Sequence, residues 1–263
     1  MRKLYIIIPA YNEDKRIGPT LNEYLSFYNP NLTEVIVVIN NTTDRTEEIV
    51  KQYEEVYPNL SHLVTPHGGK GHAIMLGWQE ALNRSQEDED MICFVDADNA
   101  IDPENLCKVI IDLDLDPLGK ARAAIASRYL QDSILGPAQS FKRIFASRLF
   151  NLVIRIILHL RYADTQCGCK VIYAKELKAL LPFITSMRWS WDVDFLMQLK
   201  NNKIKCVEVP ILWRDKEYSK INFFKSGPKM VLGIIRIRIL NSPFKVLIRL
   251  YNKLPAWCKI KIE

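Results

Sequence analysis

The sequence predicts an α/β protein with a doubly wound, mostly parallel sheet, and three observations lead to this prediction. Short strands alternate with helical segments through the first half of the chain. The strands are continuous apolar runs, such as Tyr5–Ile8 and Ile92–Val95, which is typical of parallel strands covered by helices on both faces. Polar loops follow these strands, at the edge where sheets of this class bind ligands.

The first two strand–helix units are predicted as follows. A strand is expected over Leu4–Pro9, where an apolar run ends in the turn Pro-Ala-Tyr-Asn-Glu. A helix over Ile17–Phe27 follows it, and the apolar run within Glu34–Ile39 predicts the second strand. Asn41 opens the segment Asn-Thr-Thr-Asp, whose side chains can cap a helix over Asp44–Tyr57.

The next two units bring more polar loops to the same edge. A short strand over Leu60–Thr65 leads into the turn His-Gly-Gly-Lys-Gly, from which a helix over Gly71–Asn83 is expected. The strand Met91–Val95 ends in Asp-Ala-Asp-Asn, and a further helix is expected to start near Pro103. Because the carboxyl ends of parallel strands meet on one rim, four polar loops should converge there. These loops are Pro9–Glu13, Asn40–Asp44, Pro66–Gly71 and Asp96–Asn99.

The bulk composition is that of a globular chain of 263 residues with a net charge of +6. Basic residues outnumber acidic ones from Lys200 onward, so an anionic partner is expected. These basic residues lie among aliphatic ones without a recognisable reading motif, which argues against nucleic acid. The scattered cysteines form no CxxC pair and the chain opens on a strand rather than a signal peptide, so a reducing, cytoplasmic setting is expected.

Asp96 and Asp98 lie two positions apart directly after a strand, with only Ala97 between them. Positions i and i+2 of an extended chain share a face, and a divalent cation would relieve the repulsion between two carboxylates there. Hard cations such as Mg²⁺ and Mn²⁺ prefer oxygen ligands. The pair therefore predicts a metal site. The alternative is that the segment only caps the following helix.

The loops that precede the second and third helices suit a nucleotide. Backbone amides after Asn41 can receive anionic oxygens at a helix start. Glycines around Lys70 permit close backbone approach, and the lysine would meet a phosphate, unless it is a solvated surface lysine. The sequence contains neither a Walker motif nor a dinucleotide fingerprint.

Three helical segments of the second half have large apolar faces. Phe141–Arg161 is predicted as a long helix with one narrow polar stripe, and Pro228–Leu240 and Phe244–Leu254 repeat the theme. The stripe consists of Arg148, Asn151, Arg155 and His159. Cationic amphipathic helices with aromatic edges lie in membrane interfaces, so we expect monotopic attachment to a membrane. The alternative is a set of helices that pack in the core.

Seven motifs in order resemble those of the family 2 glycosyltransferases, which have the GT-A nucleotide-sugar-binding fold. They are Ile6–Glu13, Gly68–Ile74, Asp96–Ala100, Ser127–Tyr129, Asp164–Ile172, Arg188–Leu196 and Trp213–Lys220. Together they span about residues 1–222, which we take as the catalytic domain, with 223–263 as a basic, membrane-associating region. Within the family the motifs are most similar to dolichyl-phosphate β-glucosyltransferases and next to dolichyl-phosphate mannose synthases. The mannose synthases usually carry Gln at the position of Ala100.

The resemblance implies an inverting, metal-dependent enzyme at the cytoplasmic face of a membrane. It would transfer a hexose, glucose being favoured, from a nucleoside diphosphate sugar such as UDP-glucose to dolichyl or another polyprenyl phosphate, for glycan assembly. The cofactor would be Mg²⁺ or Mn²⁺. Transfer of mannose from GDP-mannose is the alternative within this class.

The resemblance also implies roles for individual residues. Asp98 and Asp96 would bind the metal, and Asp96, Asp98, Arg128, Asp192 and Lys220 are the candidate catalytic residues. The nucleotide-sugar would be bound by Pro9, Ala10, Tyr11, Glu13, Asn40, Lys70, Asp96 and Ala97. The acceptor phosphate would be bound by Arg128 and Lys220, which lie in the motifs. Arg143 and Arg148 are further candidates for this phosphate because of their position near the start of the predicted helix Phe141–Arg161.

Two positions leave other functions open. Asn40 stands where the family usually has an acid that contacts the base. Asp192 stands where members that act on sugar hydroxyls carry a general base, so a transferase of that kind is an alternative. Helical spacing puts Asp192 and Asp194 on different faces, so we expect only one of them at the site. A nucleotide-binding scaffold without catalysis is a further alternative.

Overall fold

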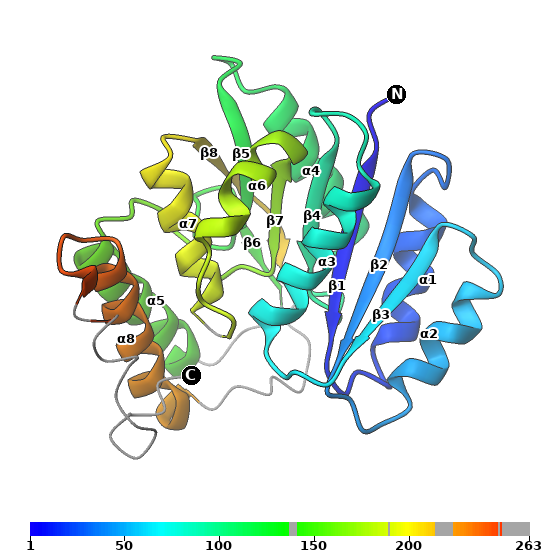
Figure 1. Cartoon of the computed structure of the whole chain (residues 1–263), viewed down its shortest axis with the longest axis horizontal. Helices are drawn as coiled ribbons and strands as arrows, with labels where there is room; N and C mark the ends of the chain where they lie inside the picture. The colour runs from blue at the N-terminus through cyan, green and yellow to red at the C-terminus, as the bar shows by residue number, and fades with distance from the viewer. Residues whose placement is uncertain (137–140, 189, 214–222, 247, 249–263) are drawn as a thin grey trace.

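The computed structural model of the protein describes residues 1–136, 141–188, 190–213, 223–246 and 248 (Figure 1). The elements of the first half are β1 (Leu4–Ala10), α1 (Ile17–Phe27), β2 (Thr33–Asn40), α2 (Thr46–Glu54), β3 (Leu60–Thr65), α3 (Lys70–Arg84), β4 (Met91–Val95) and α4 (Pro103–Asp114). Those of the second half are β5 (Ala121–Ser127), β6 (Ile134–Leu135), α5 (Phe141–Leu158), β7 (Cys169–Tyr173), α6 (Ala174–Leu180), the 3₁₀ turn η1 (Leu181–Phe183), α7 (Trp191–Asn201), β8 (Lys205–Pro210), β9 (Leu212–Trp213) and α8 (Phe223–Leu240).

The main sheet has the strand order β3-β2-β1-β4-β7-β5-β8. Strand β7 is antiparallel to both of its neighbours, and the other pairs are parallel. The predicted doubly wound, mostly parallel sheet is therefore confirmed. The antiparallel direction of β7 matters for the site, because β7 begins where β4 ends, with Cys169 opposite Val95.

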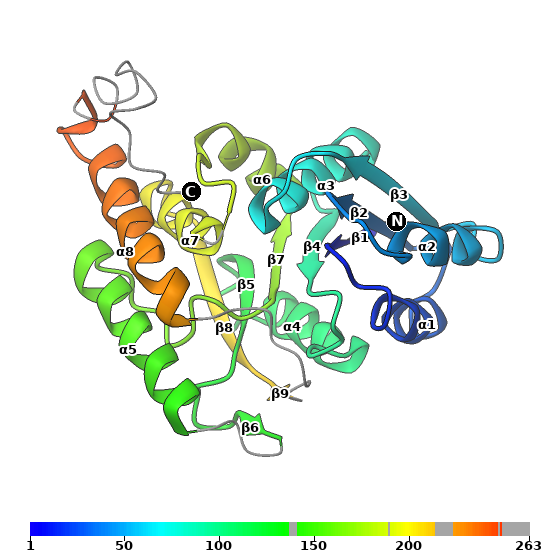
Figure 2. The ribbon, with the colours of Figure 1, turned by 90° about the horizontal axis from the view of Figure 1, so that it is seen from below.

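Helices cover the sheet on both faces (Figure 2). One core layer packs α1, α2 and α4 against one face, and the other packs α3, α5, α6, α7 and α8 against the opposite face. Alternation along β1 divides its side chains between the two layers: Ile6 and Ile8 enter the first, Tyr5 and Ile7 the second. Continuous apolar strands are needed because both faces are buried.

Two predicted helices are shorter in the structure. The helix expected over Asp44–Tyr57 begins only at Thr46, because the Asp44 carboxylate accepts the Thr46 N–H (3.0 Å) and so acts before the helix. The helix expected over Phe141–Arg161 ends at Leu158, where His159 takes a left-handed backbone conformation (φ +53°) that terminates it.

Helices α5 and α8 lie side by side at the β8 end of the sheet (Figures 1 and 2). Among the helices described, none combines the length and apolar character needed to traverse a bilayer. Of the predicted helix Phe244–Leu254, only residues 244–246 and 248 lie within the described part of the chain.

Candidate active site

Asp96 lies in contact with two distant parts of the sequence. Its Oδ1 forms an ion pair with Lys70 Nζ at the start of α3 (2.6 Å). Its backbone N–H donates to the Gly168 carbonyl (3.2 Å), just before β7. A Cβ at Gly168 would overlap the Asp96 carboxylate. The absence of a side chain at position 168 therefore makes the room in which this carboxylate sits.

Asp98 lies further along the same loop and is less constrained. One oxygen accepts the Ala100 N–H (3.1 Å), and the other is 3.9 Å from an Arg16 nitrogen. Arg16 also donates through Nε to Glu13 (2.6 Å), so it links the first loop to this carboxylate. Since β4 ends at Val95, both acids belong to a loop, and strand alternation does not decide which way they face.

The charges of this cluster act on one another. Burial raises the pKa of Asp96, Lys70 opposes that rise, and Asp98 adds to it, with a net increase. Burial disfavours the Lys70 ammonium, but Asp96 and Asp192 outweigh it and raise the lysine pKa. Lys70 is thus a paired cation within the site and not a solvated surface lysine.

The donor set fits a hard divalent cation. Carboxylate oxygens are the ligands that Mg²⁺ and Mn²⁺ prefer, and Mg²⁺ is commonly held by one or two carboxylates plus substrate phosphates. Among the residues that the structure describes, no group of three His, Cys, Asp or Glu side chains is arranged to hold a metal. A metal here would take Asp96 and Asp98 as protein ligands and complete its shell with oxygens of the bound diphosphate.

The first predicted loop presents one exposed aromatic ring. Tyr11 follows Pro9 and Ala10 at the end of β1 and is exposed, whereas Ala10 is fully buried. The Ala97 carbonyl accepts from Thr20 Oγ1 (2.9 Å), which fixes the loop after β4 to α1. The loop after β4 is thus fixed to α1, the helix that follows the loop carrying the exposed Tyr11.

Asn40 at the end of β2 is buried and bridges two other loops. In the amide orientation that satisfies both groups, Nδ2 donates to the Ala10 carbonyl (2.7 Å) and Oδ1 accepts the Gly69 N–H (3.2 Å). An acid in its place would have no proton for the Ala10 carbonyl. The structure therefore gives Asn40 a bridging place under the Gly-Lys-Gly loop.

A second loop closes over the Gly-Lys-Gly segment. Gly69 has φ +128°, and a Cβ there would lie 2.7 Å from the Met187 carbonyl, which also accepts the His72 N–H (2.8 Å). Asp194 holds this second loop, since its Oδ2 accepts the N–H groups of Thr185 (2.7 Å) and Ser186 (2.9 Å). Asp194 is fully buried, and its carboxylate is bound by this second loop.

Asp192, two residues earlier in α7, faces the site. Its Oδ1 forms an ion pair with Lys170 Nζ (2.5 Å), which also donates to the Cys167 carbonyl (3.1 Å). The charge of Asp192 acts on both Lys70 and Asp96. Asp192 is thus the acid of α7 whose charge acts on the predicted metal ligand Asp96.

Arg128 is engaged in a buried ion pair with Asp164. Its Nε lies 2.6 Å from Oδ2 and its Nη2 3.0 Å from Oδ1, and its backbone N–H also donates to Oδ2 (3.1 Å). Burial raises and Arg128 lowers the pKa of Asp164, with a net decrease. The guanidinium lies over the rings of Tyr129 (5.2 Å) and Trp213 (5.0 Å).

Arg148 approaches the same tyrosine from α5. Its guanidinium carbon is 5.1 Å from the centre of the Tyr129 ring, so two arginines share one aromatic partner. Arg143 lies in the first turn of α5, and its side chain is outside the described part of the structure. Lys220 lies outside the described residues altogether.

The predicted polar stripe of α5 is wrong in one member. Asn151 is buried, donates to the Ala163 carbonyl (2.8 Å) and accepts from Thr165 Oγ1 (2.9 Å). Arg148 and Arg155 are exposed. Asn151 therefore anchors the loop that carries Asp164 and does not belong to the exposed face.

Three residues of the site were not singled out from the sequence: Arg16, Asp164 and Lys170. Asp164 and Lys170 lie within one motif segment, so their position gave a signal, but their partners come from distant parts of the chain. Arg16 has no motif, and only the fold brings it to Asp98.

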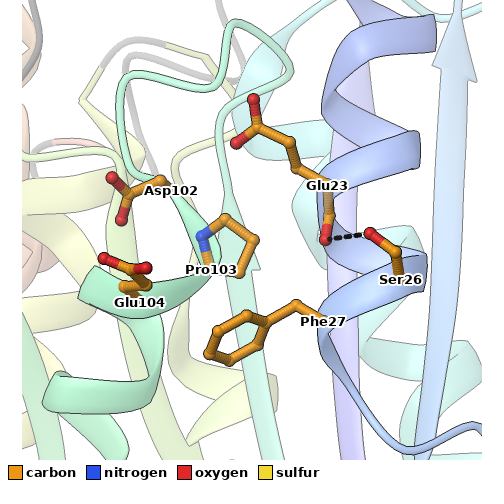
Figure 3. Close-up of a pocket in the computed structure, with 6 residues that line it drawn as sticks. All are labelled: Glu23, Ser26, Phe27, Asp102, Pro103 and Glu104. Atoms are coloured by element: carbon orange, nitrogen blue, oxygen red, sulfur yellow. Dashed lines mark hydrogen bonds between the residues drawn. The ribbon is translucent and has the colours of Figure 1, made fainter.

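A separate pocket lies between α1 and the start of α4 (Figure 3). Its lining residues are Glu23, Ser26, Phe27, Asp102, Pro103 and Glu104. Asp102 already accepts the Asn105 N–H (2.9 Å) as the cap of α4. The pocket contains none of the predicted site residues.

Comparisons with known proteins agree with the fold. The sequence model of the family described as glycosyl transferase family 2 matches residues 5–176. A dolichyl-phosphate beta-glucosyltransferase of Trichomonas vaginalis is 31% identical over 245 residues, which is 89% of this chain and 70% of the relative. The human dolichyl-phosphate beta-glucosyltransferase is 27% identical over 260 residues, covering 93% of this chain and 78% of the relative.

A solved structure has the same arrangement of elements. Glucosyl-3-phosphoglycerate synthase from Mycobacterium tuberculosis, crystallised with Mn²⁺, UDP and phosphoglyceric acid, superposes with a TM-score of 0.63 and 16% identity. The match covers 90% of this chain and 78% of the synthase. The same enzyme has been crystallised with Mg²⁺ and UDP. This similarity confirms the predicted GT-A fold.

Proposed function

The chain belongs to glycosyl transferase family 2, and from this premise we propose that it transfers glucose from UDP-glucose to dolichyl or another polyprenyl phosphate. It is a glycosyltransferase by family. The two relatives compared above act as dolichyl-phosphate beta-glucosyltransferases by name, and their similarity extends over most of this chain. That similarity supports both the sugar and the class of acceptor.

One structural observation carries the proposal for the acceptor: both carboxylates of α7 are already bound by groups of the protein. Asp192 is paired with Lys170, and Asp194 accepts hydrogen bonds from Thr185. A sugar hydroxyl acceptor needs a general base to remove its proton. A phosphate monoester, with a second pKa of about 6, already carries an oxyanion at neutral pH. The site therefore suits an acceptor that brings its own nucleophilic charge.

The donor would bind across the loops that follow β1, β2 and β4. Tyr11 would lie against the nucleoside, with Pro9 and Ala10 beside it and Glu13 held by Arg16. Asn40 would act through the Gly69 loop that it supports. Mg²⁺ or Mn²⁺ bound to Asp96 and Asp98 would supply positive charge to the leaving diphosphate. Lys70, already a cation in the site, would add to that charge.

The chemical step is a single displacement. A phosphate oxygen of the acceptor forms a bond to the anomeric carbon while the bond from that carbon to the diphosphate oxygen breaks, and the electron pair leaves with the diphosphate. No proton has to move at the nucleophile. An α-linked donor would give a β-linked product, which accords with the names of the relatives.

The acceptor phosphate would be held by arginines beside Tyr129. Arg128 is oriented by Asp164, and Arg148 reaches the same ring from an exposed position on α5. We assign Arg143 and Lys220 to this group from the sequence alone. Cations are needed here because the donor and the acceptor are both anions that must approach closely.

We further propose that the protein acts as a peripheral protein at the cytoplasmic face of a membrane. On α5, Leu149, Leu152 and Ile156 are exposed large apolar side chains, and Arg148 and Arg155 flank them. This pattern suits the interface of a bilayer that carries anionic lipid. We retain residues 1–222 as the catalytic domain and 223–263 as the basic region, although α8 buries Ile234 and Ile237 in the second core layer.

A donor panel tests the proposed function. UDP-glucose, GDP-mannose and UDP-N-acetylglucosamine are each incubated with polyprenyl phosphate in Mg²⁺, in Mn²⁺ and in EDTA, and lipid-linked label is measured. We expect metal-dependent labelling from UDP-glucose. Labelling from GDP-mannose would change the assigned sugar. Hydrolysis of the donor without lipid labelling would contradict the assigned acceptor.

A further inference from the structure

Lys170 is a lysine buried inside the second core layer beside the site. It lies on β7 directly opposite Phe94 of β4 in the antiparallel register. Its side chain is 1% exposed, whereas that of its partner Asp192 is 8% exposed. Of the two side chains, that of Asp192 thus retains the larger exposed area.

Lys170 contacts two hydrogen-bond acceptors and an aromatic ring. Nζ bonds to Asp192 Oδ1 and to the Cys167 carbonyl, and it lies 5.3 Å from the centre of the Phe94 ring. Lys70 Nζ lies 5.1 Å from the same ring. Two lysine–aspartate pairs, Lys170 with Asp192 and Lys70 with Asp96, thus lie around one phenylalanine.

A buried ion pair of this kind is weak evidence for a role in stability. The free-energy cost of removing both charges from water often equals the gain from their attraction. Apolar residues can therefore replace such a pair without loss of stability. The presence of a lysine on an inner strand of the sheet, beside the site, therefore points to a role for its charge in the site.

We propose that Lys170 is a positioning residue for glycosyl transfer, and this inference rests on the proposed function. It holds Oδ1 of Asp192 and cancels the charge of that carboxylate. The other oxygen is left to accept a hydrogen bond from a hydroxyl of the donor sugar. The cancelled charge also lets the anionic acceptor phosphate approach a site that already contains Asp96 and Asp98.

The proposal separates two kinetic effects of Lys170. Loss of the charge leaves Asp192 uncompensated, so the acceptor phosphate is repelled and its KM rises. Loss of the hydrogen bond leaves the Asp192 carboxylate unoriented, so the sugar is held less well in the transition state and kcat falls. Removing the carboxylate charge as well should reverse the first effect only.

The test compares Lys170→Met with the double variant Lys170→Met/Asp192→Asn in full-length protein, using UDP-glucose and polyprenyl phosphate. We expect Lys170→Met to raise the acceptor KM by roughly 10-fold or more, as like charges repel strongly in such a site, and to lower kcat. The double variant should recover the acceptor KM and keep the low kcat. Lys205→Met is the matched control, because Lys205 pairs with Asp116 (2.7 Å) at the opposite end of β5 and β8.

Three results would overturn the proposal. They are an unchanged acceptor KM in folded Lys170→Met, a double variant whose KM stays as high as that of the single variant, and a double variant with the kcat of the unmodified protein. If Lys170→Met does not fold, the double variant alone tests the proposal, because its side chains at positions 170 and 192 are both neutral. If the unmodified protein labels no lipid, the proposed function is wrong. The role of Lys170 is then tested by hydrolysis of UDP-glucose, and a rate for the double variant equal to that of the unmodified protein would overturn that role.

Discussion

The Asp96 carboxylate and the Gly168 backbone are packed so closely that a Cβ at position 168 would overlap the carboxylate. The contact exists because β7 runs antiparallel to β4, which brings the residue before β7 next to the residue after β4. A reversal of direction in one strand thus places a glycine under a predicted metal ligand.

Gly168→Ala should displace the Asp96 carboxylate and reduce metal-dependent transfer about 10-fold or more, since small misplacements of reacting groups are costly. Overpacking at this position should lower the free energy of unfolding by about 1–3 kcal/mol. Gly18→Ala is the control, because a Cβ at that helical position meets its nearest atoms only at 3.6 Å. Activity of Gly168→Ala equal to that of the control would contradict the assigned place of Asp96.

Asn40→Asp should weaken both stability and UDP binding. The ionised carboxylate of this variant could still accept the Gly69 N–H, but it would face the Ala10 carbonyl as a second acceptor. We expect the free energy of unfolding to fall by about 1–3 kcal/mol, measured by urea denaturation. The deficit should shrink as the pH falls, because a protonated acid can donate. Asn41→Asp, at an exposed position with φ +50°, is the control.

Asp164→Asn and the unmodified protein should differ in how their free energy of unfolding changes with acid. The pKa of Asp164 in the folded protein is below its ordinary value of 3.8. Its stabilisation is therefore fully present above that value and is lost as the pH falls through the folded pKa. Breaking the buried pair with Arg128 should lower the free energy of unfolding by about 3–5 kcal/mol at neutral pH.

Urea denaturation across the pH range checks this prediction. The difference between Asp164→Asn and the unmodified protein should be constant near neutral pH and should narrow below about pH 3.8. Asp132→Asn, at an exposed position, should show no such difference. A gap that stays constant down to the acid transition would mean that the carboxylate charge does not stabilise the pair.

Leu152→Asp/Ile156→Asp should release the protein from vesicles that contain anionic lipid. These side chains are 49% and 63% exposed on α5, so their replacement costs little folding free energy while charge is introduced into the proposed interface. Sedimentation with vesicles measures the effect. Val56→Asp, at a side chain that is 70% exposed after α2, should sediment like the unmodified protein. Equal sedimentation of all three proteins would favour core-packing helices.

The first half of the fold is predictable because local signals agree there. Each apolar run from β1 to β4 is long enough to be recognised as a buried parallel strand, and the predicted bounds agree with the structure to within one residue. The strands of the second half give weaker signals. In β7 a lysine lies in the middle of a fully buried run, and only the distant Asp192 explains how that lysine can be buried.

The candidate site is predictable as a set of loops but not as a set of contacts. From the sequence motifs, we predict Asp96, Lys70 and Arg128 as charged groups that contact substrates. In the structure, Lys70 is paired with Asp96, and Arg128 with Asp164. Local sequence cannot show such pairs, because their members come from separate strands and loops that only the sheet topology brings together.

We propose that the acceptor supplies its own negative charge, because Lys170 pairs with Asp192 and cancels the charge of that carboxylate. The most direct test of this proposal is transfer of labelled glucose from UDP-glucose to polyprenyl phosphate and, in parallel, to the uncharged polyprenol of the same length. We expect label in the phosphate alone, and we expect EDTA or the substitution Asp98→Asn to abolish it. Comparable label in the polyprenol would show that the site can deprotonate a hydroxyl, and would contradict the proposal.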